Sequence, residues 1–195
     1  PGANIRLAGL DFARGDKLLA AGRRLSAADI GLAAAMNLPE LPVRRRPRVA
    51  ILSTGDELEL PGAALTEDRI AAANGFALAA LVRDWGGEPL DLGIARDSKD
   101  AIQASARRAL GADLLVTSGG ASVGEHDLVQ SALGDAGMQL DFWKIALRPG
   151  KPLMFGRIGE LPLLGLPGNP VSALVCAILF LRPAIDCMLG IASPG

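Results

Sequence analysis

The sequence predicts a three-layer α/β/α fold built on a mostly parallel sheet and preceded by a small partial domain. From residue 48 onward, short strand-like runs alternate with helix-length segments, which is typical of βαβ units. One of these runs, ADLLVTSG at 112–119, is almost wholly apolar, as expected for a strand covered by helices on both faces. Hydrophobic residues make up 50% of the 195-residue chain, which is enough for one full core and a small appendage.

Residues 1–46 are predicted to belong to a different domain from the rest of the chain. They contain short apolar stretches separated by glycines, and too few large apolar residues for a core of their own. Ser26 predicts a helix start, because it precedes Ala-Ala-Asp and so places an acid at the third helical position. The run RRRPR at 44–48 contains a proline and no flanking aromatic residue, so we interpret it as a solvated linker.

The larger region, residues 47–190, is predicted to hold the sheet and its helices. Strands are expected at 48–54, 89–95, 112–119, 139–147, 152–158 and 161–166, and helices at 68–86, 98–111, 125–137 and 169–189. The first helix would present one apolar face, made of Ile70, Ala73, Ala77, Leu78, Leu81 and Trp85. Ser98 is the expected N-cap of the second helix.

Charge and composition argue against several classes of partner. A formal net charge of −1 and a pI of about 5.9 do not favour a nucleic-acid-binding surface. Cys176 and Cys187 share one apolar segment without metal-ligating neighbours, so buried thiols in a reducing compartment are expected. The longest apolar run, residues 171–181, ends at Arg182 and is too short to cross a membrane. Without a recognisable signal peptide, we expect a cytoplasmic protein with no nucleic-acid or membrane partner.

Glycines, hydroxyls and acids follow the predicted strands at five places. Ligands of open α/β sheets bind at the carboxyl ends of the strands, so these loops are expected to share one rim. Each loop alone could be ordinary turn chemistry, whereas five on one rim indicate a binding site. The loops are STGDE at 53–57, ARDS at 95–98, TSGGASVGEHD at 117–127, RPGKP at 148–152 and LPGNPVS at 166–172.

These loops suit a polyanionic ligand with a divalent metal. Three glycines allow close backbone approach, and the helix after Asn169 and Pro170 would offer the N–H groups of Val171 and Ser172 to an anion. Arg148 and Lys151 would supply positive charge. The acids that could hold Mg²⁺, or else serve as helix caps and first-turn acids, are Asp56, Glu57, Asp97 and Asp127.

Known short motifs explain little of this pattern. The glycine spacing does not fit GxGxxG, and no GxxxxGK[ST] exists because Gly150-Lys151 is followed by proline. Residues 120–124 match GxSxG, but the only histidine, His126, stands four residues after Ser122. A triad base normally comes from a distant loop, so an esterase is disfavoured and His126 is interpreted as an exposed first-turn residue.

Taken together, STGDEL, the following Asn74, the Asp97 loop, TSGGASVGEHD, RPGKP and LPGNPVSA resemble the molybdopterin molybdenumtransferases, the MoeA family, in order and spacing. The resemblance covers residues 1–190 and extends to the gephyrin E domain. It implies that 1–46 is the second half of the family's lower domain and that 47–190 is a MogA-like molybdopterin-binding domain. Residues 191–195 would then lead to a C-terminal β domain.

The resemblance also implies a reaction, in which molybdenum from molybdate enters adenylylated molybdopterin with release of AMP and the help of Mg²⁺. It implies a homodimer in the full-length protein and an adenylyltransferase partner similar to MogA. By the same resemblance, Asp97 and Asp127 would bind the metal and act in catalysis with Glu57, Lys144 and Lys151. The pterin-nucleotide would contact Thr117, Ser118, Gly119, Gly120, Ser122, Gly124, Arg148, Pro152, Gly168, Asn169, Pro170 and Ser172.

Two positions depart from the family pattern. Arg148 stands where a lysine is usual, which keeps the charge and changes its geometry, and Asn37 stands where glycine is usual. Three alternatives remain open: a MogA-like molybdopterin adenylyltransferase, a non-catalytic scaffold, and a general phosphoryl-ligand-binding domain. Residues 1–43 and the LPGNPVS loop favour the transferase over the adenylyltransferase.

Overall fold

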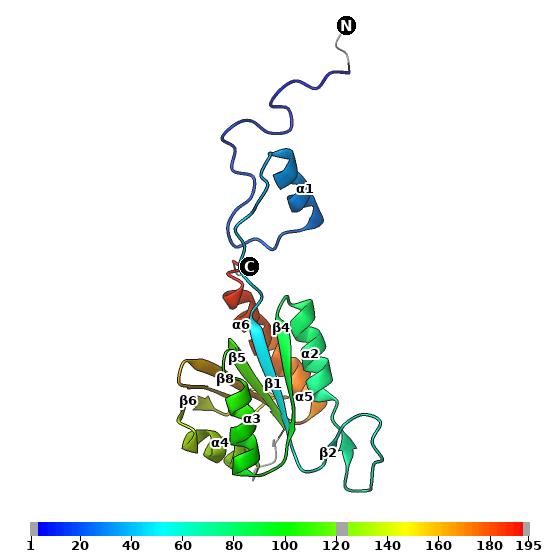
Figure 1. Cartoon of the computed structure of the whole chain (residues 1–195), viewed down its shortest axis with the longest axis vertical. Coiled ribbons are helices and arrows are strands. Elements are labelled where there is room, and N and C mark those ends of the chain that lie inside the picture. The colour runs from blue at the N-terminus through cyan, green and yellow to red at the C-terminus, as the bar shows by residue number, and fades with distance from the viewer. Residues whose placement is uncertain (1–3, 120–124, 193–195) are drawn as a thin grey trace. The chain divides into compact units, whose positions relative to one another are not determined.

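The computed structural model describes residues 4–119 and 125–192, without the side chains of residues 125–127 (Figure 1). The chain divides into two compact units, Pro1–Arg44 with Gly190–Gly195, and Arg45–Leu189. The larger unit carries the sheet and the polar loops, and the smaller unit is built around one helix. The assignment of residues 1–46 to a lower domain stays a prediction.

The smaller unit contains α1, Ala27–Ala35, which begins as predicted at Ser26. The Ser26 hydroxyl accepts a hydrogen bond from the Asp29 N–H at 3.3 Å, and the Asp29 carboxylate accepts one from the Ser26 N–H at 2.8 Å. The Asp29 carboxylate also accepts from the Ser26 hydroxyl at 2.7 Å and pairs with Arg23 at 2.8 Å. The hydrogen bonds that it accepts from the Ser26 N–H and hydroxyl, followed by the contact with Arg23, lower the pKa of Asp29 to about 2. Asn37 follows the helix at φ 61°, a conformation that glycine favours and asparagine tolerates.

The larger unit contains a six-stranded sheet, as the sequence predicts. Its parallel strands are β4 (Glu88–Ala95), β1 (Arg48–Thr54), β5 (Leu114–Gly119) and β8 (Leu161–Leu166), adjacent in this order. The edge beyond β8 is formed by β7 (Met154–Ile158) and β6 (Met138–Trp143), both added antiparallel to their neighbours. The β6 strand ends four residues earlier than the predicted segment 139–147.

Helices cover both faces of this sheet, which confirms the three-layer architecture (Figure 1). One face is covered by α2 (Asn74–Asp84), α5 (Pro170–Cys176), the π-helical turn η1 (Ala177–Leu181) and α6 (Arg182–Met188). The other face is covered by α3 (Lys99–Arg108), which Ser98 caps as predicted, and α4 (Glu125–Asp135). Alternate side chains of the central strands feed the two cores: Ala50 and Leu52 face α3 and α4, and Val49 and Ile51 face α2 and α6.

The predicted helix at 68–86 is wrong over its first six residues, because α2 begins only at Asn74. Ile70–Ala71 instead forms the short strand β3, which pairs in parallel with β2, Leu58–Glu59. The Ile70 side chain is 55% exposed, whereas Leu78 and Val82 are fully buried on the inner face of α2. The Ile70 N–H donates to the Glu57 carbonyl at 2.8 Å, so pairing with a distant segment outweighs the local helical pattern.

The last helical stretch is longer than the apolar run that marks it in the sequence. It extends through Arg182 to Met188, and an 18-residue window of this 19-residue stretch has a mean hydropathy of 1.9, which by length and composition alone would suit a membrane span. Its inner face, which includes Cys176, Leu181 and Ile185, is fully buried against the sheet. That packing is typical of a helix that covers a core. Cys187 is exposed, contrary to expectation. It follows the buried Ile185 by two residues, and in a helix two residues turn a side chain to the opposite face.

The topology brings the polar loops to one edge of the sheet. Chain connections run from β1 outward to β4 and then back across to β5, so the strand order reverses between β1 and β5. Such a reversal leaves a crevice at the carboxyl ends of the two strands. The antiparallel β7 pairs Met154 with Gly165 near the end of β8, so the loop before β7 lies at the same edge.

Candidate functional site

A cavity of about 430 Å³ lies at the point where the strand order reverses. Its walls come from the ends of β1 and β5, the start of α2, the β2–β3 ribbon and the loop between β8 and α5. The cavity lining contains no lysine or arginine among the described residues. It is lined by Ser53, Thr54, Glu57, Leu58, Ile70, Ala71, Ala72, Ala73, Asn74, Ser118, Gly119, Gly168, Asn169 and Pro170.

Two glycines, Gly119 in the cavity lining and Gly55 beside it in the chain after β1, allow close contacts that a side chain would prevent. Gly119 has φ 129°, and a Cβ there would lie 2.0 Å from the Thr54 carbonyl oxygen. Gly55 has φ 148°, and a Cβ there would lie 2.6 Å from the Glu57 carboxylate oxygens. Gly119 therefore lets two strand ends approach each other, rather than only admitting a ligand as the sequence suggested. Gly55 gives the Glu57 carboxylate room to fold back over the backbone.

Asn74 ties three elements together at the wall of the cavity. From the first residue of α2, its amide nitrogen donates to the Ser118 hydroxyl at 3.0 Å and to the Gly168 carbonyl at 2.7 Å. The Ser118 hydroxyl is almost fully buried at the end of β5, beside Thr117, which is buried within the strand. Asn74 was not among the predicted binding residues, although its place after STGDEL in the motif order was the signal for it.

Three residues of the cavity lining have side-chain polar atoms without a hydrogen-bond partner among the described residues. Ser53 is 6% exposed, and its hydroxyl makes no hydrogen bond within the described chain. The Thr54 hydroxyl oxygen is buried and has no partner there either. The Glu57 carboxylate lines the cavity and forms no hydrogen bond or ion pair to any described residue. Buried polar groups without partners are rare in folded proteins, so Ser53, which also lines the cavity, indicates a ligand-contacting surface there.

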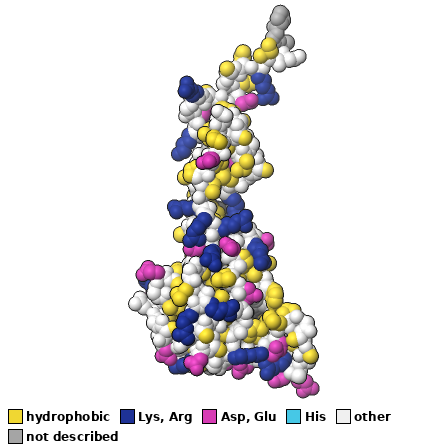
Figure 2. All heavy atoms as spheres, viewed as in Figure 1, with side chains coloured by type: hydrophobic (Ala, Val, Ile, Leu, Met, Phe, Trp, Pro, Cys, Tyr) yellow, Lys and Arg dark blue, Asp and Glu magenta, His cyan; other side chains and the backbone are white. Residues whose placement is uncertain are grey.

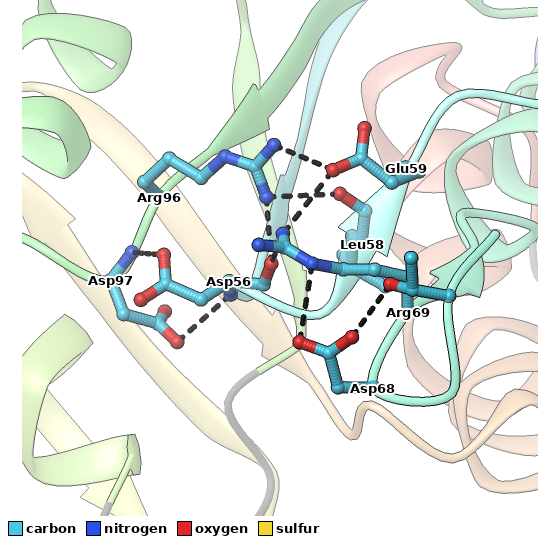
Figure 3. Close-up of polar contacts among 8 residues, drawn as sticks. Asp56, Leu58, Glu59, Asp68, Arg69, Arg96 and Asp97 are labelled. Atoms are coloured by element: carbon cyan, nitrogen blue, oxygen red, sulfur yellow. Dashed lines mark hydrogen bonds and ion pairs between the residues drawn. The ribbon is translucent and has the colours of Figure 1, made fainter. Parts of the chain in front are cut away.

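The neighbouring acids Asp56, Glu59 and Asp97, all among the described residues, have hydrogen-bond partners (Figure 3). Asp56 and Asp97 join the loops after β1 and β4, because each carboxylate accepts the other residue's N–H, at 3.0 and 3.1 Å. Arg96 donates to the Asp56 carbonyl at 2.7 Å and to Glu59 at 2.9 Å. Arg69 also binds Glu59, at 3.2 Å, and donates to the Asp56 carbonyl. This network links the β2–β3 ribbon to the rim.

Among the described residues, the predicted metal-binding acids do not form one cluster. No group of three or more histidine, cysteine or acidic side chains suited to a metal occurs among them. One Asp97 oxygen accepts the Asp56 N–H, and the Asp127 side chain lies outside the described part. The pair of Asp97 and Asp127 as metal ligands therefore stays a prediction.

The basic loop between β6 and β7 stands apart from the cavity lining. Lys144 has φ 70°, and its ammonium lies 3.8 Å from the centroid of the Trp143 ring. The cavity lining includes none of the residues Lys144, Arg148, Lys151 and Pro152. Beneath this loop lies the buried Cys176 thiol, 3.9 Å from the Gly150 carbonyl oxygen, and burial raises the pKa of that thiol.

The start of α5 differs from the prediction in one respect. Pro170 occupies the first turn and Asn169 caps the helix, as the sequence indicates. The Asn169 side-chain oxygen accepts hydrogen bonds from the Ser172 N–H at 3.1 Å and from the Ser172 hydroxyl at 3.3 Å. The Ser172 N–H is therefore already bonded, so the expectation that it is free for an anion is wrong.

The structure thus brings together only part of the predicted site. Six predicted residues line the cavity: Glu57, Ser118, Gly119, Gly168, Asn169 and Pro170. Thr117 lies behind it, and the Asp97 loop, Ser172 and the basic loop lie outside its lining. Gly120, Ser122 and Gly124 lie outside the described residues. Sequence reasoning missed Ser53, whose only signal was its position at the end of the first strand.

Comparison with known proteins identifies the family. The family described as "Probable molybdopterin binding domain" matches residues 50–186. Molybdopterin molybdenumtransferase 2 of Mycobacterium tuberculosis is 42% identical over 202 residues, which span 100% of this chain and 49% of that relative. The molybdopterin molybdenumtransferase of Nostoc sp. is 40% identical, across 98% of this chain and 45% of its own length.

A solved structure agrees with these sequence matches. The molybdopterin biosynthesis MoeA protein of Pyrococcus horikosii superimposes with a TM-score of 0.86 at 35% identity, covering 95% of this chain and 46% of that protein. The chain spans about half the length of the curated relatives it matches. The family match extends over most of the chain and includes the sheet from the third residue of β1 onward, so the chain belongs to the molybdopterin-binding domain family.

Proposed function

We propose that this chain is the pterin-nucleotide-binding part of a molybdopterin molybdenumtransferase. The reaction would insert molybdenum from molybdate into adenylylated molybdopterin and release AMP. The observation that carries the proposal is the cavity at the strand reversal, with its unpartnered polar groups, in a chain 42% identical to a relative of that name. A role in molybdenum cofactor biosynthesis accounts for both.

The two kinds of polar surface at the rim suit two parts of such a reaction. The cavity offers one carboxylate, hydroxyls and amides, which match an uncharged hydrogen-bonding ring. The loop with Lys144, Arg148 and Lys151 offers positive charge for the phosphates and for molybdate, a tetrahedral dianion. Both lie at the carboxyl edge of one sheet, which is where a single elongated substrate would reach them.

Mg²⁺ is proposed as the metal, held by Asp97 and Asp127. Mg²⁺ commonly binds through one or two carboxylates together with substrate phosphates, so it does not require a cluster of three acids. The described residues fit this role through the Asp97 carboxylate, which has one oxygen bonded to the Asp56 N–H and a second oxygen for a ligand. When bound, the metal would neutralise phosphate charge as the anhydride breaks.

The partners and location are proposed on the same basis. The full-length protein would act as a homodimer in the cytoplasm and receive its adenylylated substrate from a MogA-like adenylyltransferase. The relatives from Mycobacterium tuberculosis and Haemophilus influenzae are named molybdopterin molybdenumtransferases, which supports the substrate. The dimer, the location and the adenylyltransferase partner are proposed from the resemblance of the motifs to that family.

The test measures AMP released from adenylylated molybdopterin by the full-length protein when molybdate and Mg²⁺ are added. We expect molybdate-dependent release that is lost in the double variant D97N/D127N, and no formation of adenylylated molybdopterin from ATP. Undiminished AMP release by the double variant would contradict the assignment of Asp97 and Asp127 as metal ligands. ATP-dependent adenylylation by the wild-type protein would instead support the adenylyltransferase.

A further inference from the structure

The Glu57 carboxylate is distinguished from the neighbouring acids by having no described partner. Asp56 and Asp97 bond each other's main chain, and Glu59 binds Arg69 and Arg96. Glu57 lines the cavity, held against the backbone where Gly55 lacks a Cβ. No lysine or arginine among the described residues lines the same cavity. An anion placed beside Glu57 would be repelled, whereas a group with N–H donors would be attracted.

Donors face the cavity from another side. Ser53 is 94% buried and borders the cavity near the end of β1, and its hydroxyl has no partner within the described chain. Next to it begins α2, an 11-residue helix whose N-cap, Ala73, supplies no side-chain hydrogen bond. The helices α1, α3 and α5 each have a side-chain cap, so α2 is the one of these four whose first N–H groups lack a side-chain acceptor.

The cavity therefore offers one ligand the two acceptor oxygens of Glu57, together with the Ser53 hydroxyl and the first N–H groups of α2 as donors. Its wall also contains a run of small apolar side chains, Ala71, Ala72 and Ala73, which suits a flat ring. A planar heterocycle with adjacent N–H donors beside a carbonyl oxygen would match this pattern. The amino-amide edge of a pterin has these groups: the 2-amino group, the N3–H and the 4-oxo oxygen.

We propose that the cavity binds the amino-amide edge of the pterin ring, with Glu57 accepting two N–H groups and Ser53 with the start of α2 donating to the 4-oxo oxygen. This inference rests on the proposed function, since that function supplies the pterin. It makes Glu57 a specificity-determining binding residue rather than a metal ligand. The phosphates are left to the basic loop, outside the cavity.

The experiment compares two probes on the 195-residue chain by fluorescence titration. Pterin is 2-amino-4-oxopteridine, and lumazine carries a second oxo group in place of the amino group. A carboxylate accepts both N–H groups of pterin, but it faces a carbonyl oxygen in lumazine. We expect the wild-type chain to bind pterin at least about tenfold more tightly than lumazine, because an unpaired polar group in a binding site is costly.

The Glu57→Gln variant gives the sharpest readout. Its amide keeps one acceptor and gains one donor, so it matches the lumazine edge and mismatches the pterin edge. The variant should therefore bind lumazine more tightly than pterin, a result that loss of structure alone would not produce. Ser53→Ala should weaken both probes by a similar factor of a few, and Glu67→Gln, an exposed acid outside the cavity lining, should change neither.

Two results would overturn the assignment. Equal binding of pterin and lumazine, including no binding of either, would show that the edge is not recognised here. Tighter binding of pyrophosphate by Glu57→Gln than by wild type would show that an anion occupies the cavity instead. In either case, molybdate-dependent AMP release by the full-length protein still decides the proposed function separately.

Discussion

Asp56 and Asp97 exchange main-chain hydrogen bonds through their carboxylates, at 3.0 and 3.1 Å, and so join the loops that leave β1 and β4. Asp97 is also a proposed metal ligand, and the two roles can be separated by substitution. Asp97→Asn keeps an acceptor oxygen for the Asp56 N–H, but it loses the negative charge that Mg²⁺ requires.

We therefore expect D97N to retain the free energy of unfolding while it loses Mg²⁺-dependent AMP release in the full-length protein. D97A should lose the release and also about 1 kcal/mol of stability, since a typical net hydrogen bond contributes that much. Urea denaturation at neutral pH measures the stability of both variants. If D97N proves as destabilised as D97A, the geometric role has been misassigned.

Asn74 supports a second prediction, because one amide group bonds both Ser118 and Gly168. Asn74→Ala should lower the free energy of unfolding by about 2 kcal/mol, since it leaves a buried hydroxyl and a carbonyl oxygen short of a donor. Asn74→Asp should be no better, because a carboxylate cannot donate to the Gly168 carbonyl. Urea midpoints of the two variants check this, and a midpoint unchanged in both would contradict it.

Gly119 is expected to be intolerant of any side chain. A Cβ there would lie 2.0 Å from the Thr54 carbonyl oxygen, and φ of 129° is strained for other residues. Gly119→Ala should therefore cost about 3 kcal/mol or more. Gly134→Ala is the matched control, since that position lies within α4 and a Cβ there meets nothing within 4 Å. The control should leave thermal unfolding unchanged or raise its midpoint slightly, because alanine favours the helix.

Asp113 gives a prediction about pH. Its two oxygens accept from both terminal nitrogens of Arg45 at 2.5 and 2.6 Å, and from the Arg48 N–H at 2.7 Å. The hydrogen bond to Arg45, with that of the Arg48 N–H and both arginine charges, lowers the pKa of Asp113. A carboxyl with a lowered folded pKa stabilises the fold above its unfolded pKa of about 3.9 and loses that stability as pH falls toward the folded value.

The urea midpoint of the wild-type chain should therefore fall more steeply on acidification below about pH 4 than that of D113N. Far from acid, between pH 6 and 7, both chains should show a flat dependence on pH. Parallel curves for the two chains down to pH 2.5 would mean that Asp113 does not contribute to the acid sensitivity.

Much of the larger unit follows from short-range pattern. The strands at Arg48–Thr54 and Leu161–Leu166 match their predicted bounds, because a buried strand needs continuous apolar residues and ends where polar ones begin. The caps at Ser26, Ser98 and Asn169 were predictable because each side chain reaches an N–H only three residues away.

The failures lie where partners are distant in sequence. Ile70 fits a helical face, yet it pairs with the β2 segment more than ten residues earlier. The unpartnered state of Glu57 could not be predicted either, since it depends on Arg69 and Arg96 both turning to Glu59 instead. A sequence shows which acids are present, whereas the fold decides which of them meet an arginine.

The direction of β7 determines how the basic residues are delivered to the rim. A strand of five residues spans about 16 Å, so a parallel β7 would have put its preceding loop at the opposite edge of the sheet. A parallel connection would also have required a crossover of a dozen or more residues. Because the chain turns back on itself, the cavity and the basic loop are instead built from different segments at the same edge of the sheet. A substitution at Lys144, Arg148 or Lys151 therefore alters the charge at the rim without replacing any residue of the cavity lining.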